Sequence, residues 1–213
     1  MANLVIKPAS GSTNKLVLQN QAGTVDAITV EDSGSTTLAG TANALGTVTS
    51  GTLGSAVSFP AGHIVGYAIV TETYSAGTAG GTFASGGWRP RAINTIREDA
   101  DFLTGVSGGL FTLIAGKYLI EWACTAFLVN HWKSRLFISG VGPQAHGLQL
   151  YGETDDDTVT VSSGSAIVTR VSSSPFGIDC YCNTTHNTDG FGRASNLDST
   201  NSDYCIVKIL KLT

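Results

Sequence analysis

The chain has 213 residues, which suits one domain with a tail or two small domains. Only 13% of its residues are charged, 26 are glycine, and the formal net charge is −4. This composition is too apolar for general disorder, lacks the basic footprint of a nucleic-acid-binding protein, and contains no Lys/Arg cluster that would favour an anionic membrane.

The first residues, MANLVIKPASGSTNK, lack the basic and apolar regions of a secretory signal. The sequence also contains no apolar run long enough for a transmembrane helix, so we expect no membrane insertion.

Residues 1–58 are rich in Gly, Ser, Thr and Ala and contain almost no aromatic residue. Short alternating stretches predict strands at Lys15–Gln19 and Ala27–Val30, separated by turn-forming residues. The following stretch, Thr37–Leu53, has no large side chains and cannot bury a core by itself. It is either a flexible linker or a thin β-segment whose apolar residues meet those of two other chains. We favour the second interpretation, because linkers rarely carry alternating strands.

The composition changes at Phe59-Pro60, and from about His63 aromatic and branched residues occur at strand spacing. The expected strands are His63–Thr71, Phe111–Leu113, Gly116–Val129, Lys133–Ile138, Gly147–Tyr151, Val159–Val161, Ala166–Val171, Phe176–Cys182 and Tyr204–Leu212. Turns are expected at Gly140–Pro143 and Ser162–Ser165, and a short helix or turn near Asn94–Asp99. Many short strands at regular spacing predict an all-β chain: an extended N-terminal segment, 1–58, then an antiparallel jelly-roll sandwich, 59–213.

Within that domain, Gly116–Val129 carries the strongest strand signal, because apolar residues alternate along it on both faces. One face presents Tyr118, Ile120, Trp122, Cys124, Ala126 and Leu128. The other presents Leu119, Ala123, Phe127 and Val129. A strand that is apolar on both faces needs an apolar partner on each side, such as a second sheet and another subunit. We therefore expect a sandwich that assembles into an oligomer.

Residues 85–213 resemble a C-terminal domain of bacteriophage tail-fibre and virion proteins, a jelly roll like those of tumour necrosis factor and complement subcomponents. The resemblance is carried, in order, by Trp88-x-Pro90-Arg91-x-Ile93-Asn94-Thr95, Phe111-Thr112-Leu113-x-Ala115-Gly116-x-Tyr118, His131-x-Lys133-x-Arg135-Leu136, Gly190-Phe191-Gly192-x-Ala194-Ser195-Asn196 and Tyr204-x-Ile206-Val207-x-Ile209-x-Lys211. The stretch Leu38–Leu45 also resembles the leader segments of marine-phage fibres. The loop from Gly140 to Val159 and the strand near Cys180 depart from the family pattern.

The resemblance implies a homotrimer in which Tyr118, Ile120 and Trp122 face the sandwich core. It places the trimer-interface candidates Leu119, Ala123 and Phe127 against the threefold axis. The two-faced apolar strand supports the same assembly independently.

Two functions fit this resemblance. The first is a trimeric tail fibre or tail-tip adhesin, whose segment 1–58 docks on other virion proteins and whose jelly roll binds a glycan or protein of the host surface. The alternative is a trimeric capsid decoration, head-fibre or cement protein with the same parts. Either would be a virion component assembled in the host cytoplasm, which agrees with the absence of a secretory signal.

The exposed recognition candidates are Trp132, which lies near a predicted turn, and the acidic run Asp155, Asp156 and Asp157. With Glu153, this run is either a calcium site or a solvated turn. Its spacing does not match the calcium loop Asp-x-Asp-x-Asp-Gly, so we expect no metal there. The other tryptophans, Trp88 and Trp122, are expected mainly in packing rather than in a sugar-binding platform.

The remaining reactive residues form no recognisable catalytic motif. Two interpretations fit the cysteines. They are reduced, half-buried thiols, or Cys180 and Cys182 form a zinc site that His186 or Cys205 completes. We favour thiols, because the usual Cys-x2-Cys spacing of a zinc site is missing. The histidines are scattered, no Gly-x-Ser-x-Gly elbow occurs, and paired carboxylates at a recognisable separation are missing. We therefore expect a protein that is not an enzyme and that needs no cofactor.

Overall fold

The computed structural model describes residues 16–19, 26–30, 36–38, 64–152, 157–196 and 198–212. The chain divides into two compact units, Met1–Val57 and Ser58–Thr213. The first unit contains a three-stranded antiparallel sheet of β1 (Leu16–Gln19), β2 (Asp26–Val30) and β3 (Thr36–Leu38). Most of the predicted stretch 37–53 lies outside the described residues.

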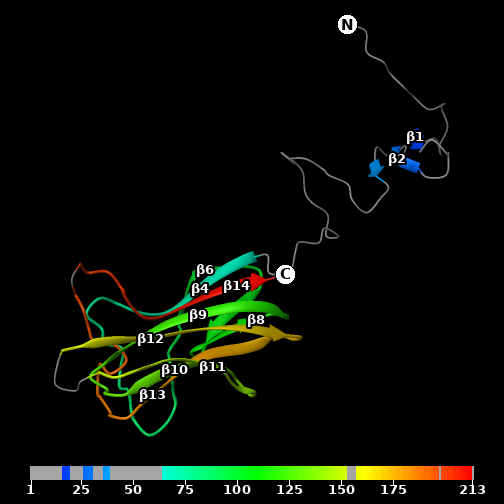
Figure 1. Cartoon of the computed structure of the whole chain (residues 1–213). Coiled ribbons are helices and arrows are strands. Elements are labelled where there is room, and N and C mark those ends of the chain that lie inside the picture. The colour runs from blue at the N-terminus through cyan, green and yellow to red at the C-terminus, as the bar shows by residue number, and fades with distance from the viewer. Residues whose placement is uncertain are drawn as a thin grey trace. The chain divides into compact units, whose positions relative to one another are not determined.

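The second unit contains two antiparallel sheets packed face to face (Figure 1). The five-stranded sheet has the order β12-β9-β14-β4-β6. Its strands are β4 (Ile64–Tyr74), β6 (Thr95–Glu98), β9 (Gly116–Phe127), β12 (Val159–Arg170) and β14 (Ser202–Leu212). The chain therefore returns at its C-terminal end to pair β14 between β9 and β4, which is a non-sequential order typical of a jelly roll.

The six-stranded sheet has the order β11-β10-β13-β8-β7, with β5 also paired to β13. Its strands are β5 (Arg89–Pro90), β7 (Leu103–Ser107), β8 (Leu110–Leu113), β10 (Trp132–Ile138), β11 (Gly142–Leu150) and β13 (Ser174–Cys182). The predicted all-β sandwich with jelly-roll architecture is confirmed. Among the described residues, no helix has the length and apolar character that a membrane crossing requires.

The core lies between the two sheets and is built by the inward residues of each strand. On β9, Tyr118, Ile120 and Trp122 are buried, while Glu121 between them is exposed, as the alternation predicts. Opposite them, Trp132, Leu136 and Ile138 of β10 and Phe176 and Ile178 of β13 are buried. The sequence periodicity therefore identified the core face of the central strand correctly.

A buried ion pair closes one end of this core. Arg91 follows β5, has no exposed side-chain surface, and donates from Nε to Glu72 Oε2 at 2.6 Å. Its other nitrogens donate to the carbonyl oxygens of Thr125, Phe191 and Tyr204 at 2.8–3.1 Å. Burial by itself would lower the pKa of Arg91, but the Glu72 carboxylate outweighs this and the pKa lies above its ordinary value.

Two local predictions were wrong. Residues 95–98, within the range expected as a helix or turn, form the edge strand β6, which pairs with β4. The expected turn Ser162–Ser165 is the middle of the continuous strand β12. There Gly164 sits opposite Trp122, and an added Cβ would clash with the indole. The glycine makes room for a large core side chain and does not break the strand.

Candidate assembly face and recognition surface

The outward side of the five-stranded sheet carries two groups of apolar side chains, separated by the polar row Ser165, Glu121 and Lys208, and we call the two groups together the apolar face. Cross-strand pairing sets Leu119 of β9 beside Ile167 of β12 and Leu210 of β14. Leu210 in turn pairs with Tyr67 of β4. Further along, Ala123 lies beside Ile206. The members of the apolar face are Tyr67, Leu119, Ala123, Val161, Ile167, Ile206 and Leu210.

Several of these side chains are unusually open for branched or aromatic residues. Ile167 is 63% exposed, Tyr67 is 55% exposed and Val161 is 50% exposed. Val161 and Ile167 stand on β12, which is the edge strand of its sheet. An edge strand with exposed β-branched residues can pair or pack against another chain, and folded proteins usually protect such an edge. We therefore expect another protein surface to pack against these exposed side chains.

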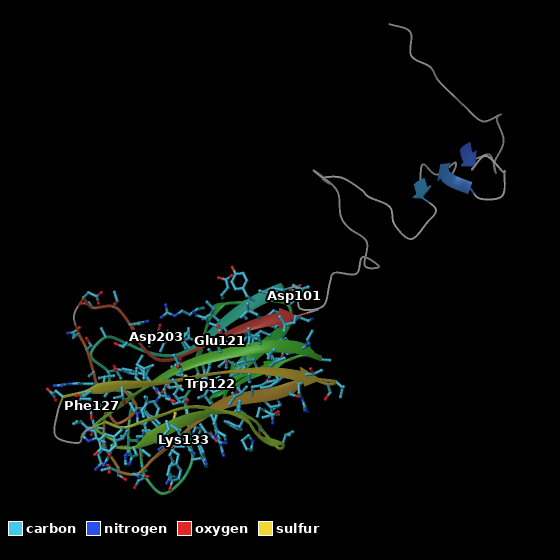
Figure 2. The ribbon with its side chains drawn as sticks, viewed as in Figure 1. Asp101, Glu121, Trp122, Phe127, Lys133 and Asp203 are labelled. Atoms are coloured by element: carbon cyan, nitrogen blue, oxygen red, sulfur yellow. The ribbon has the colours of Figure 1, made fainter. Side chains whose placement is uncertain are left out.

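The charges at the centre of this face are opposite in sign. Glu121 of β9 and Lys208 of β14 are directly opposed across the strand pair, and both are exposed. Figure 2 shows Glu121 on the five-stranded sheet and Lys133 on the other sheet of the sandwich. The two opposite charges leave no net charge at the centre of the face, but each would lose hydration when the face is covered.

A hollow of about 670 Å³ opens at the β12 side of the apolar face. Ser163, Gly164 and Ser165 line part of this hollow, and their small side chains leave space beside Trp122. Leu148 of β11, which is 62% exposed, lines the same hollow. The face thus combines protruding apolar side chains with a recess that can receive them.

Leu119 and Ala123, two of the predicted interface residues, lie on the apolar face and are half-buried. Phe127 follows them in register but is only 3% exposed. Its ring packs edge-on against His186, with ring centroids 5.5 Å apart, and the Arg193 guanidinium lies 5.0 Å from its centroid. Phe127 is therefore covered within its own chain, and its predicted contact with other subunits stays a prediction.

Of the predicted acidic recognition residues, only Asp157 belongs to the described part of the chain. Its carboxylate lies 2.6 Å from Nη1 of Arg193, and its side chain is 73% exposed. By accepting this hydrogen bond and by its charge, Asp157 raises the pKa of Arg193. Asp155 and Asp156 lie outside the described residues, so the predicted cluster is known only through its last member.

The prediction that Trp132 is exposed was wrong. Trp132 is 2% exposed, its ring packs edge-on against Phe83 at 6.1 Å, and its Nε1 donates to Thr160 Oγ1 at 2.7 Å. It begins β10, where the alternation directs it into the core with Ser134 and Leu136. Its place near a turn suggested exposure, but the strand phase decides which side of the sheet it faces.

Trp88 is the tryptophan that reaches the surface. It precedes β5, is half-buried, and lies on the outward side of the six-stranded sheet. The Arg135 guanidinium lies 3.9 Å from its ring centroid, and Lys133 Nζ lies 5.7 Å away. Tyr181 and His146 flank the indole at 5.7 and 5.8 Å. We call these five residues the Trp88 platform.

All four cysteines are free and fully buried, more deeply than the half-buried thiols expected from the sequence. Cys124 and Cys205 face each other across β9 and β14, with their Sγ atoms 2.8 Å apart. Burial raises the pKa values of Cys124 and Cys180 well above the ordinary thiol value, so both remain protonated near neutral pH. Cys180 and Cys182 share the core face of β13, as their spacing predicts. No group of three or more possible metal ligands occurs within the described ranges.

Comparison with models of known protein families finds no match, and comparison with curated proteins finds none. Several solved structures are similar. The globular domain of zebrafish complement 1qA protein aligns with 67% of this chain and 92% of its own, at 16% identity and a TM-score of 0.38. Murine APRIL aligns over 69% of this chain and 100% of its own, at 7% identity and a TM-score of 0.45. Eiger TNF from S. frugiperda aligns with 69% of this chain and 92% of its own, at 14% identity and a TM-score of 0.42.

Proposed function

We propose that this chain is a non-enzymatic structural protein of a bacteriophage virion, and that it forms a homotrimeric tail fibre or tail-tip adhesin. The observation that carries the proposal is the apolar face, together with the hollow beside it. Neither feature pairs a nucleophile with a base, and both suit contact with another protein. The order of sequence motifs over residues 85–213 supports the phage setting.

A second copy of the same chain is the occupant that best fits the apolar face. A sheet face and a sheet edge are different surfaces, so contact between the face of one copy and the edge of the next is heterologous. Such contacts close into a ring when the rotation allows it, and the motif resemblance favours three copies. Exposed apolar residues of the edge, such as Leu148 and Val161, are then available to the neighbouring copy.

The energetics favour assembly, because every apolar contact is repeated in each copy. Full burial of a large side chain such as Ile167, Tyr67 or Leu119 contributes about 1.5–3 kcal/mol. Glu121 and Lys208 oppose each other on the same face, so covering it leaves no net charge at its centre.

The test measures the mass of the full chain in solution by light scattering. We expect three times the 22.0 kDa of one chain. Ile167→Asp and Leu119→Asp place a carboxylate on the apolar face and should give monomers. Ile167 is the better site, because it is exposed in one chain and its replacement leaves the core intact. Thr112→Asp, at a half-buried strand position on the other sheet, is the matched control and should remain trimeric.

A monodisperse wild-type monomer would overturn the proposed assembly, and so would a trimer that survives both aspartate variants. The place in the virion is tested separately by counting copies per particle with quantitative mass spectrometry. A tail fibre or tip gives a small number set by the symmetry of the tail. A copy number that scales with the capsid lattice would replace the proposal with the capsid decoration or cement protein.

A further inference from the structure

We propose that the Trp88 platform and the hollow beside it form a binding site for acidic saccharides. This inference deepens the proposed function, because it assigns the adhesin a ligand class and a location. The site lies on the outward side of the six-stranded sheet, and the apolar face lies on the outward side of the other sheet. The two surfaces meet only at His146, which flanks Trp88 and also lines the hollow beside the apolar face. The other four residues of the platform do not line that hollow, so a trimer built on the apolar face leaves them free.

The indole of Trp88 is held in place by its neighbours. Arg135 supports it from the sheet side and is itself fixed by Asp179, whose Oδ2 accepts from Nε and Nη2 at 3.2 and 2.8 Å. The loop before it is tied down as well, since Arg89 Nε donates to the Ala84 carbonyl at 3.2 Å. An aromatic surface fixed before binding loses little conformational entropy when a ligand arrives.

A hollow of about 190 Å³ adjoins the platform. Tyr181 and Lys133 belong to both, which makes the two features continuous. The residues that line the hollow are His131, Trp132, Lys133, Gln149, Tyr181 and Asn183. Tyr151, which is 63% exposed, packs beside His131 of this lining, and the centroids of the two rings are 4.3 Å apart.

This set of groups matches the chemistry of a sugar ring. The face of Trp88 that points away from Arg135, and the ring of Tyr181, suit the apolar C–H face of a pyranose. The amides of Gln149 and Asn183 can donate to and accept from ring hydroxyls. A small concave site with apolar walls and a few polar groups is the usual form of a small-ligand pocket.

The charge of the hollow favours an acidic sugar over a neutral one. Among the described residues, its lining contains the Lys133 ammonium and no carboxylate. The nearby Asp179 is already engaged with Arg135, so it offers little repulsion to an anion. A carboxylate on a hexose, as in a uronic acid, would gain a charge-assisted hydrogen bond from Lys133.

The experiment presents the full chain to a panel of uronate polysaccharides (alginate, polygalacturonate and hyaluronan) and of neutral ones (dextran and maltooligosaccharides). Binding is read on an array and by protection of tryptophan fluorescence from acrylamide. Trp88 should dominate the quenchable signal, because Trp122 and Trp132 are each 2% exposed. We expect at least one uronate polymer to bind and to protect Trp88, and the neutral polymers to bind at least tenfold more weakly.

Two variants locate the site. Trp88→Ala should abolish binding, and Lys133→Gln, which keeps length and removes charge, should weaken uronate binding at least tenfold. Lys117→Gln, at an exposed position on the other sheet, is the matched control and should bind as wild type. No binding to any uronate polymer would overturn the inference. Equal binding to acidic and neutral polymers, or uronate binding that Trp88→Ala or Lys133→Gln leaves unchanged, would overturn it as well.

The oligomer test and the saccharide test can fail independently. The platform is complete within one chain, so the Ile167→Asp variant should keep the fluorescence protection and lose only the avidity seen on the array. A trimer without saccharide binding would refute the ligand and leave the assembly intact. A monomer that binds uronates would refute the assembly and leave the proposed ligand intact.

Discussion

At the scale of single residues, Arg91 joins more of the fold than any other polar side chain described above. It links Glu72 of β4 to Thr125 of β9, to the loop at Phe191 and to Tyr204 of β14. A guanidinium suits this position because its planar fork can donate to several oxygens at once. Removing it would leave the buried Glu72 carboxylate without its counter-charge, while the carbonyl oxygens of Phe191 and Tyr204 would keep only the Thr125 hydroxyl as donor.

We therefore predict that Arg91→Met destabilises the domain by about 3–5 kcal/mol, the usual cost of breaking a buried ion pair from one side. Urea denaturation at fixed protein concentration measures this loss. Arg97→Met is the matched control, because the Arg97–Asp203 pair is formed by an arginine whose side chain is 46% exposed. That change should cost less than about 1 kcal/mol.

If Arg91→Met does not fold, the double variant Arg91→Met/Glu72→Met still tests the argument. Replacing both partners removes the uncompensated charge, so the double variant should be more stable than Arg91→Met alone. Equal stabilities for Arg91→Met and Arg97→Met would show that the buried pair has no special role.

The tryptophans show what sequence reasoning can and cannot resolve at this scale. Trp122 was placed correctly, since it lies in a long strand whose alternation fixes its face. Trp132 opens a strand directly after a turn, and a displacement of one residue there reverses the predicted side. Trp88 lies outside any long strand, so its exposure depends on Arg135, Tyr181 and His146, which come from other strands. Such a cluster cannot be read from local spacing.

At the scale of elements, β12 depends on a glycine whose role is steric. Gly164 pairs with Trp122, and an added Cβ would also lie 2.7 and 2.8 Å from further atoms of the indole. The indole is held on the same side, because Nε1, which is bonded to one of these atoms, donates to Ser134 Oγ at 2.8 Å. It therefore cannot move aside without losing that bond.

We predict that Gly164→Ala destabilises the domain by about 1–3 kcal/mol, although alanine is normally no worse than glycine in a strand. Urea denaturation again provides the measurement, with Ser165→Ala on the outward side of the same strand as the control, expected within about 0.5 kcal/mol of wild type. A double-mutant cycle with Trp122→Phe identifies the cause. The smaller ring should remove much of the penalty of Gly164→Ala, and additive effects would contradict the steric explanation.

The other misread elements have the same physical origin. Ser-Ser-Gly-Ser resembles a turn by composition, yet the Ser162 hydroxyl is buried, donating to the Leu148 carbonyl and hydrogen-bonded with Ser134 Oγ. The edge strand β6 is short, mostly exposed and held by β4. In both places distant partners, and not local propensity, determine the strand.

At the scale of the whole molecule, the sequence predicted the all-β class, the sandwich and the position of most long strands. Strand existence follows from alternation, which is local. The assignment of strands to two sheets is not local, because β14 inserts between β9 and β4 from the far end of the chain. The apolar face was anticipated through Leu119 and Ala123. Its larger part, on β12, β14 and β4, emerged only when those strands were brought into register.

The division at Val57 leads to a prediction about the two units. Among the described residues, the hydrophobic core runs from Ala68 to Ile209, entirely within the second unit. The fragment 58–213 should therefore fold and keep the oligomeric state of the full chain. Its melting temperature should lie within about 2 °C of that of the full chain, the shift expected when only surface interactions change.

Virion incorporation separates folding from attachment. If residues 1–58 dock on other virion proteins, the fragment should fold and yet be missing from purified particles, which is checked by immunoblotting particles assembled with each form. Residues 58–213 fused to an unrelated segment of equal length provide the control, and should be excluded in the same way. A fragment that unfolds would mean that the second unit needs the first. A folded fragment that still enters particles would move the attachment site onto the jelly roll, where the apolar face or the β11–β12 edge would then have to contact the virion.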